Sequence, residues 1–285
     1  MTARTAGRLH VVATPIGNLD DLSPRALRTL REVAVIAAED TRHTQQLLAA
    51  NGARGHLVAL HEHNEAHQID ALLARLRAGE DVALVSDAGT PLISDPGFRL
   101  VRAARSAGIE VSPVPGPCAA IAALSVAGLP SDRFVFEGFL PAKAGARRDR
   151  LQALASESRS LVFYESAHRI EESLADMSVG FGAERRAVLA RELTKRFETV
   201  LDGTLAELVQ RVANDPDQRR GEFVVIVDGA GEHVDAALRE GRRVYAKLAE
   251  HLPPSTAARV AAELTGAPRK ALYGASAKEF EPPLT

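Results

Sequence analysis

The chain has 285 residues, of which 46% are hydrophobic and only 4% aromatic, and its formal net charge at pH 7 is −2. This length accommodates two domains and a small appendage, and the small net charge excludes attraction of a polyanion by the molecule as a whole. A single cysteine, Cys118, excludes an internal disulfide framework and predicts a cytoplasmic protein, while the lack of a long apolar run predicts no membrane span.

The first half of the chain alternates short apolar runs with polar turns, which predicts a parallel sheet with helices between its strands. The first strand, residues 9–13, leads into a loop in which Pro15 and Gly17 present the backbone to a ligand. Ser23 then predicts the cap of a helix that ends near Glu32.

A cluster of ionisable residues follows the second predicted strand, residues 33–37. Glu39, Asp40 and Arg42 suit acid–base chemistry or the binding of a polar substrate. The alternative is an ordinary helix start with Asp40 or Thr41 as its N-cap. Both interpretations are open at this point.

Three histidines within residues 61–67 follow a third predicted strand, residues 57–60. They allow a metal site, but the zincin pattern H-E-x-x-H is absent because Glu65 occupies the place of its second histidine. We therefore predict no metal here and a polar, substrate-facing loop that contains His61 and Asn64.

Residues 82–97 are the centre of the pattern. Val82–Val85 is typical of a buried parallel strand. In the turn that follows, the Asp87 carboxylate and the backbone at Gly89 can contact a ligand. The alternative is an ordinary strand-to-helix turn with a capping Asp. The next predicted elements are a helix over 98–107, a strand over 111–114 and a helix that starts at Cys118 and Ala119.

The second half begins at a predicted hinge, residues 128–131, followed by a strand over 134–139. Lys143, Arg147 and Arg148 belong to a run of four cations in eight residues, a density that suits phosphate contacts. A solvated helix face is the alternative.

A further predicted strand begins at Ser160 and ends in polar residues that include His168 and Arg169, and another covers residues 223–227. From residue 232 the composition shifts to short helices, predicted over 244–251, 256–264 with Ser255 as cap, and 268–273. This pattern predicts a helix-turn-helix-like module, for which a sequence-specific DNA reader is the rival interpretation.

Four motifs carry a family resemblance: Ala13–Leu19, Ala38–Arg42, Ser86–Gly97 and Val114–Pro117. Together they resemble the tetrapyrrole methylase superfamily, and within it the branch that methylates a cytidine 2′-hydroxyl of small-subunit (16S) ribosomal RNA. The resemblance implies two α/β domains with S-adenosyl-L-methionine in the cleft between them, usually in a homodimer. We expect an N-terminal α/β domain over 1–128, a C-terminal α/β domain over 129–231 and a helical RNA-recruiting module over 232–285.

The resemblance and the strand ends together predict the site. The residues expected beside the methyl donor are Pro15, Asp87, Ala88, Gly89, Thr90, Cys118, Ala119, Tyr164 and Glu165. Those expected on the RNA side are Arg42, Asn64, Lys143, Arg147, Arg148, His168 and Arg169. Asp40 is the leading candidate for the base that takes the hydroxyl proton, because we expect its neighbour Glu39 to raise its proton affinity. His61 is the second candidate.

Two other functions are open. One is methylation of a tetrapyrrole or another small molecule, although Glu165 stands where the tetrapyrrole branches have Met, which favours a polar substrate. The other is a non-catalytic RNA-binding assembly protein that keeps the fold without turnover.

Overall fold

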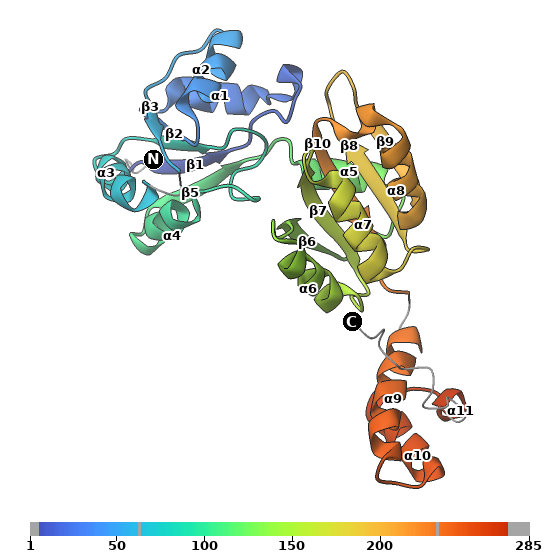
Figure 1. Cartoon of the computed structure of the whole chain (residues 1–285). Coiled ribbons are helices and arrows are strands. Elements are labelled where there is room, and N and C mark those ends of the chain that lie inside the picture. The colour runs from blue at the N-terminus through green and yellow to red at the C-terminus, as the bar shows by residue number, and fades with distance from the viewer. Residues whose placement is uncertain (1–5, 62–63, 232–233, 273–285) are drawn as a thin grey trace.

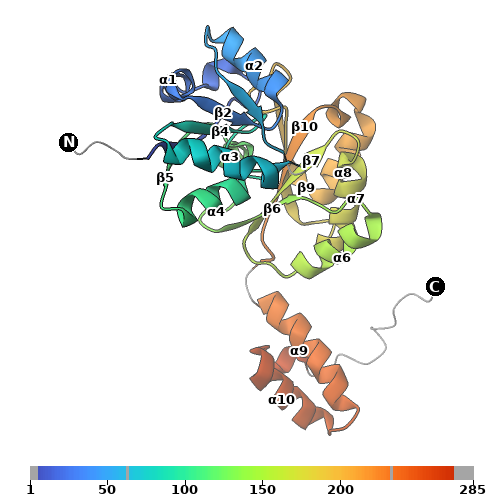
Figure 2. The same cartoon turned by 90° about the vertical axis from the view of Figure 1, so that its left-hand side faces the viewer.

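A computed structural model of the chain describes residues 6–61, 64–231 and 234–272. Two α/β units lie side by side, and a separate helical lobe extends from the second unit (Figure 1, Figure 2). The predicted fold class, two α/β units with a small C-terminal helical module, is confirmed.

The first unit is built on a fully parallel sheet in which β4 occupies the centre. The four residues of β4 are all buried, because helices cover both faces of the sheet. In spatial order the strands are β3 (Leu57–Ala59), β2 (Val35–Ala38), β4 (Val82–Val85), β1 (Arg8–Val12) and β5 (Glu110–Val114).

Apolar stripes on the helices of the first unit determine which face of the sheet each helix covers. Leu72 and Leu100 lie in the core on one face, and Leu30 and Leu48 lie in the core on the other. The first face is covered by α3 (Glu65–Arg77) and α4 (Phe98–Ser106), and the second by α1 (Pro24–Glu32) and α2 (Thr41–Ala50).

The second unit has a mixed sheet in which β7 pairs with β6 in parallel and the other pairs are antiparallel. Its spatial order is β6 (Phe134–Phe139), β7 (Ser160–Ser166), β10 (Glu222–Val227), β8 (Arg186–Arg191) and β9 (Thr199–Thr204). One face carries α6 (Ala144–Leu154), α7 (Ile170–Phe181) and α8 (Leu205–Asn214).

The other face of this second sheet is covered by α5 (Ala119–Val126). Ala120, Ala123 and Leu124 of α5 form one buried cluster with Val162 and Ile226 of the second sheet. We expected the first domain to extend to residue 128, which would include α5. Because the buried face of α5 belongs to the second core, we propose that the boundary lies between β5 and α5.

The C-terminal lobe consists of α9 (Val234–Ala249), α10 (Pro254–Thr265) and α11 (Arg269–Leu272). These helices pack on one another around Ala258, Ala261 and Leu272. The prediction of Ser255 as the helix cap is wrong, because α10 begins one residue earlier, with Pro254 presetting the helical φ of its first turn.

Candidate functional site

Backbone contacts between loops hold the carboxyl edge of the first sheet together. Thr14 and Gly89 exchange N–H···O bonds of 2.9 and 3.1 Å, which joins the loop after β1 to the loop after β4. The Thr90 hydroxyl donates to the Pro117 carbonyl at 2.9 Å, and the Asp40 N–H donates to Asp87 Oδ1 at 2.9 Å. The loops that follow β1, β2, β4 and β5 are therefore cross-linked in one layer.

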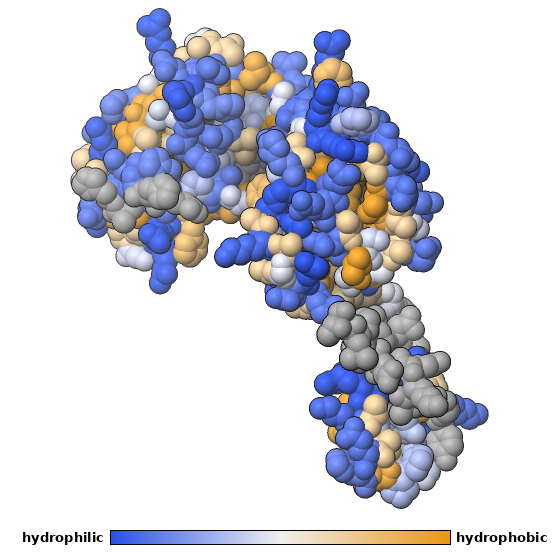
Figure 3. All heavy atoms as spheres, in the orientation of Figure 1, coloured by the Kyte–Doolittle hydropathy of each residue, from blue (hydrophilic) through white to orange (hydrophobic). Residues whose placement is uncertain are grey.

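A cavity of about 260 Å³ lies between this layer and the second unit. Its wall on the first unit consists of Ile16, Ala88, Gly89, Thr90, Ile93, Ser94 and Asp95. The wall on the second unit consists of Cys118, Ala119, Phe139, Tyr164, Glu165, Ser166, Ala190, Glu192, Leu193, Lys195, Glu222, Phe223 and Val224. We call this space the cleft cavity; in a space-filling view the surface is hollowed between the two units (Figure 3).

The Tyr164 side chain builds one corner of the cleft cavity. Within the described part of the chain, Cys118 supplies no side-chain cap for α5, and the Tyr164 hydroxyl instead accepts the Ala120 N–H at 3.1 Å. The Tyr164 ring meets the edges of Phe136 and Phe139, with centroids 5.0 and 5.7 Å apart. Burial raises the pKa of the Tyr164 phenol, so this group is a neutral hydrogen-bonding group at pH 7.

Lys195 connects the two walls of the cleft cavity. Its Nζ donates to Glu192 Oε1 at 2.9 Å and to Glu222 Oε2 at 2.7 Å, and these bonds outweigh burial and raise the pKa of Lys195. Its aliphatic stem lies on Gly17 of the first unit, where a Cβ would come within 2.3 Å of Lys195 Cγ. A side chain at position 17 would therefore require the Lys195 side chain or the loop that carries Gly17 to shift.

Most residues predicted beside the donor lie together on the cleft cavity: Ala88, Gly89, Thr90, Cys118, Ala119, Tyr164 and Glu165. Pro15 and Asp87 are chain neighbours of the lining residues Ile16 and Ala88, and the Asp87 carboxylate bonds to the Asp40 backbone. Sequence reasoning did not single out Asp95, Glu192 or Lys195. Asp95 lies in the motif Ser86–Gly97, but only the fold shows that these three residues line the cavity.

Asp40 is the N-cap of α2 and accepts the Arg42 N–H at 2.8 Å, which confirms the helix-cap alternative. We expected Glu39 to raise the proton affinity of Asp40, and this expectation is wrong. The Arg42 guanidinium donates to both carboxylate oxygens of Asp40, at 3.2 and 2.8 Å, and lowers the pKa of Asp40 from 3.8 to about 2. A carboxylate with so low a proton affinity is a poor general base at neutral pH.

The loop after β3 is held by its own polar contacts. Asn64 Oδ1 accepts the His61 N–H at 2.9 Å, and Asn64 Nδ2 donates to the Ala59 carbonyl at 3.0 Å. These bonds shape the loop that carries His61, the second predicted base. His63 lies outside the described residues, and among residues 6–61, 64–231 and 234–272 no group of three or more His, Cys, Asp or Glu is arranged to hold a metal ion.

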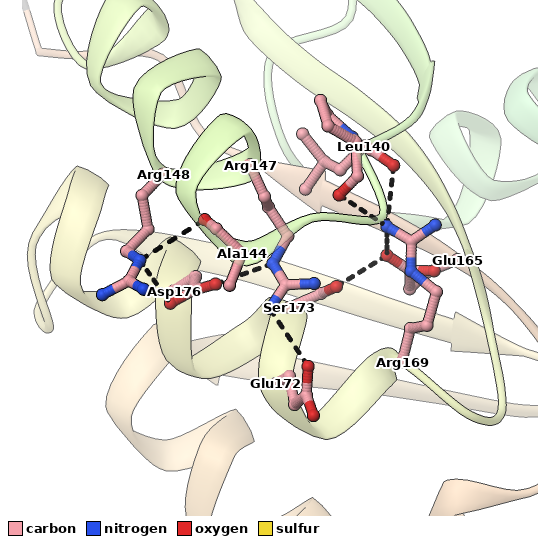
Figure 4. Close-up of polar contacts among 10 residues, drawn as sticks. Leu140, Ala144, Arg147, Arg148, Glu165, Arg169, Glu172, Ser173 and Asp176 are labelled. Carbon is pink, nitrogen blue, oxygen red and sulfur yellow. Dashed lines mark hydrogen bonds and ion pairs between the residues drawn. The ribbon is translucent and has the colours of Figure 1, made fainter.

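We expected Arg147 to contact RNA phosphates, but its side chain does not face solvent. Its Nε donates to Asp176 Oδ2 at 2.6 Å and its Nη2 to Glu172 Oε2 at 3.2 Å, and the side chain is 3% exposed (Figure 4). The partners lie on α7, so Arg147 fixes α6 to α7. The prediction that Arg147 contacts RNA phosphates is therefore wrong, whereas its neighbour Arg148 is 62% exposed.

Glu165, which is buried, and Arg169, which is half-buried, form a second group of polar contacts (Figure 4). Glu165 Oε2 accepts the Ser173 hydroxyl at 2.6 Å and lies 3.4 Å from Arg169 Nη2, which also donates to the Leu140 carbonyl at 2.7 Å. These bonds hold the end of β7 in place beside the cleft cavity. Lys143 and His168, in contrast, are exposed.

The chain matches the family described as Tetrapyrrole (Corrin/Porphyrin) Methylases over residues 8–209. It therefore belongs to the tetrapyrrole methylase family. Residues 235–276 also match a family described as RsmI C-terminal HTH domain, which covers most of the C-terminal lobe.

Several bacterial proteins that match the chain over nearly its whole length are named Ribosomal RNA small subunit methyltransferase I. The protein from Xylella fastidiosa (strain Temecula1) is 67% identical over 95% of this chain and 99% of its own. The protein from Escherichia coli O157:H7 is 53% identical over 94% of this chain and 93% of its own.

Solved structures share the fold of the two α/β units. A uroporphyrin-III-C-methyltransferase from Thermus thermophilus is 24% identical with a TM-score of 0.55, covering 78% of this chain and 94% of that one. A structure of the Thermus thermophilus enzyme complexed with S-adenosyl homocysteine is 20% identical with a TM-score of 0.54, covering 78% and 97%. In the described part of the chain, no helix is both long and apolar enough to cross a membrane.

The Asp40–Arg42 pair predicts a pH response. Because the folded pKa of Asp40 is depressed, its ionised form stabilises the fold above pH 4, and this contribution is lost as the pH falls through about 2. In Arg42→Ala, carboxyl-detected NMR should show the Asp40 pKa rising towards 3.8. Arg28→Ala, which removes another exposed arginine of the first unit, should leave it low. An Asp40 that titrates above 4 in the unsubstituted protein would contradict the pairing.

Arg147 and Arg148 form a matched pair of test positions on α6. Arg147→Ala removes the 2.6 Å bond to the shielded Asp176, which then keeps only Arg148 Nε at 4.0 Å, and should lower the free energy of unfolding by about 2–3 kcal/mol. Arg148→Ala should change it by less than about 0.5 kcal/mol, and should weaken RNA binding and reduce its salt dependence. Urea denaturation and filter binding at several salt concentrations measure these effects. Equal stability losses in the two variants would show that Arg147 is not a structural residue.

Proposed function

We propose that this protein is an S-adenosyl-L-methionine-dependent methyltransferase that methylates the ribose 2′-hydroxyl of a cytidine in small-subunit (16S) ribosomal RNA. The observation that carries the proposal is the match over both α/β units and the C-terminal lobe to proteins named Ribosomal RNA small subunit methyltransferase I. The cytidine and its 2′-oxygen come from the sequence resemblance.

The chemistry of the cleft cavity fits the donor. S-Adenosylmethionine carries a sulfonium cation and an ammonium group, and the cavity is lined by four acidic side chains against the single cation Lys195. At Gly89, φ is 81° and an added Cβ would lie 3.2 Å from Ile16 Cγ2, so the backbone itself forms this part of the wall. Phe139 and Tyr164 offer apolar ring surface suited to adenine.

We assign donor binding to the seven predicted donor residues that line the cleft cavity. Pro15 and Asp87 support the loops that carry some of these residues. Bound S-adenosylmethionine supplies an electrophilic methyl group. The chain positions the reactants, because its cross-linked loops hold one wall of the cavity and Tyr164 holds the other. Positioning of two reactants can lower the activation barrier by several kcal/mol. The chain must also take up the proton of the attacking hydroxyl.

We assign RNA binding to exposed cations around the cleft cavity and to the C-terminal lobe. Arg42, Lys143, Arg148 and His168 are exposed and suit phosphate contacts. Asn64 and Arg169 support the RNA side indirectly, since their polar atoms bond within their own loops.

We also propose that the protein acts in the cytoplasm as a homodimer. Its single cysteine and a ribosomal substrate support the location. The resemblance to a family whose members typically dimerise supports the assembly. So do Ile121 and Val126, apolar residues of α5 that are 53% and 54% exposed.

The direct test is transfer of labelled methyl from S-adenosylmethionine to purified small ribosomal subunits that lack the modification. Nuclease digestion of the product should release labelled 2′-O-methylcytidine. A uroporphyrin-type tetrapyrrole offered under the same conditions should stay unlabelled. Label in the tetrapyrrole would support the small-molecule alternative, and no label in either acceptor would support a non-catalytic assembly protein.

Removal of the C-terminal lobe tests its assigned role. A chain ending at residue 231 keeps both sheets and the whole lining of the cleft cavity. It should therefore bind S-adenosylhomocysteine with unchanged affinity by calorimetry and should lose affinity for the ribosomal substrate at least tenfold. A folded truncated protein that no longer binds the donor product would show that the lobe helps to build the cavity.

A further inference from the structure

A second cavity, of about 660 Å³, lies on the second unit beside the cleft cavity. It is lined by residues of the loop between β8 and β9, residues 192–198, and by residues of the segment before β10. We call residues 192–198 the β8–β9 loop. Glu192 belongs to both cavities, and Lys195 of the cleft cavity is the chain neighbour of Arg196 of the second cavity. The two cavities are therefore neighbours, with residues of one loop in both walls.

Backbone contacts hold the β8–β9 loop in one shape. Glu192 and Thr194 have φ values of 51° and 67°, in the left-handed region that non-glycine residues seldom adopt. The buried Arg191 side chain donates to the Arg220 carbonyl at 2.7 Å and to the Phe197 carbonyl at 3.0 Å, which ties the loop to the segment before β10. Strain of this kind persists where surrounding contacts hold it, and it concentrates at functional sites.

This fixed loop presents an aromatic ring to solvent. Phe197 is 61% exposed, in a chain in which only 4% of the residues are aromatic. The Arg196 guanidinium lies over the ring, 5.4 Å from its centroid, and within the described part of the chain Arg196 forms no ion pair. A single exposed apolar residue is ordinary, but an accessible ring beside an available guanidinium is a combination with which proteins hold unpaired nucleobases.

The charges of the second cavity favour a base over a phosphate in its interior. Four carboxylates line the cavity against three arginines, so the cavity as a whole does not attract a polyanion. Glu192 accepts a bond from Lys195 at 2.9 Å, and Glu198 accepts the Thr194 N–H at 2.6 Å. These carboxylates are satisfied within the protein, whereas the exposed Arg196 is available for a phosphate.

We propose that the β8–β9 loop is a stacking site for an unpaired nucleotide that flanks the target cytidine in the RNA substrate. The base stacks on the Phe197 ring, and Arg196 contacts the phosphate beside it. Because the same loop borders the cleft cavity, a nucleotide held on Phe197 restricts where the target ribose lies relative to the donor. This inference rests on the proposed function for the identity of the RNA, and it assigns part of the RNA recognition to the second unit.

The test compares three substitutions of exposed apolar side chains. Phe197→Ala removes the ring, Phe197→Tyr keeps a ring, and Val179→Ala changes an exposed residue near the C-terminal end of α7. Affinity for small ribosomal subunits that lack the modification, measured by filter binding with S-adenosylhomocysteine present, should fall about 5- to 100-fold in Phe197→Ala. It should stay within about twofold in the other two variants. Arg196→Ala should weaken binding and flatten its dependence on salt.

Two simple RNAs separate base stacking from other causes. Phe197→Ala should bind single-stranded poly(U) more weakly than the unsubstituted protein and should bind a poly(A)·poly(U) duplex equally well, because paired bases do not reach the ring. Calorimetry should show unchanged affinity for S-adenosylhomocysteine, since Phe197 does not line the cleft cavity.

Unchanged affinity for the subunits in Phe197→Ala, equal losses with single-stranded and duplex RNA, or loss of affinity for S-adenosylhomocysteine would each overturn the proposal. These measurements need no methyl transfer. A failure of the proposed function would therefore appear separately, as RNA that stays unlabelled while its binding still depends on Phe197.

Discussion

Thr14 and Gly89 exchange two backbone hydrogen bonds just beyond the ends of β1 and β4, and the cleft cavity depends on this exchange. Adjacent parallel strands present their following loops at the same edge, but loops alone would not form a firm wall. The exchange satisfies backbone groups that would otherwise be exposed to the cavity. Together with the Thr90–Pro117 and Asp40–Asp87 bonds, it turns separate loops into a rigid surface.

Contact between the two units provides the opposite wall. Lys195 lies on Gly17, and Ser94 lies on Gly138, so each unit reaches the other at a glycine that leaves room for it. The Tyr164 hydroxyl completes the first turn of α5 at the same junction. A ligand between the units therefore meets groups whose positions depend on both cores, which explains how distant segments of the chain act as one site.

The sequence predicts the local parts of this arrangement well. Val82–Val85 is a strand with the predicted bounds, and its four consecutive apolar residues match its burial on both faces. Seven of the nine residues predicted beside the donor line the cavity. The ion pairs of Arg147 could not be predicted, because its partners lie on another helix, 25 and 29 residues away. Pairing over that separation leaves no local pattern in the sequence.

The most direct test of the account is hydrogen–deuterium exchange of the full chain with and without S-adenosylhomocysteine. A ligand bound between the two units should slow exchange in residues 88–95 of the first unit and in residues 190–195 of the second, at the same ligand concentration. Protection confined to one unit, or centred on residues 196–199 and 215–221 outside the cleft cavity, would contradict the assignment of the donor to the cleft.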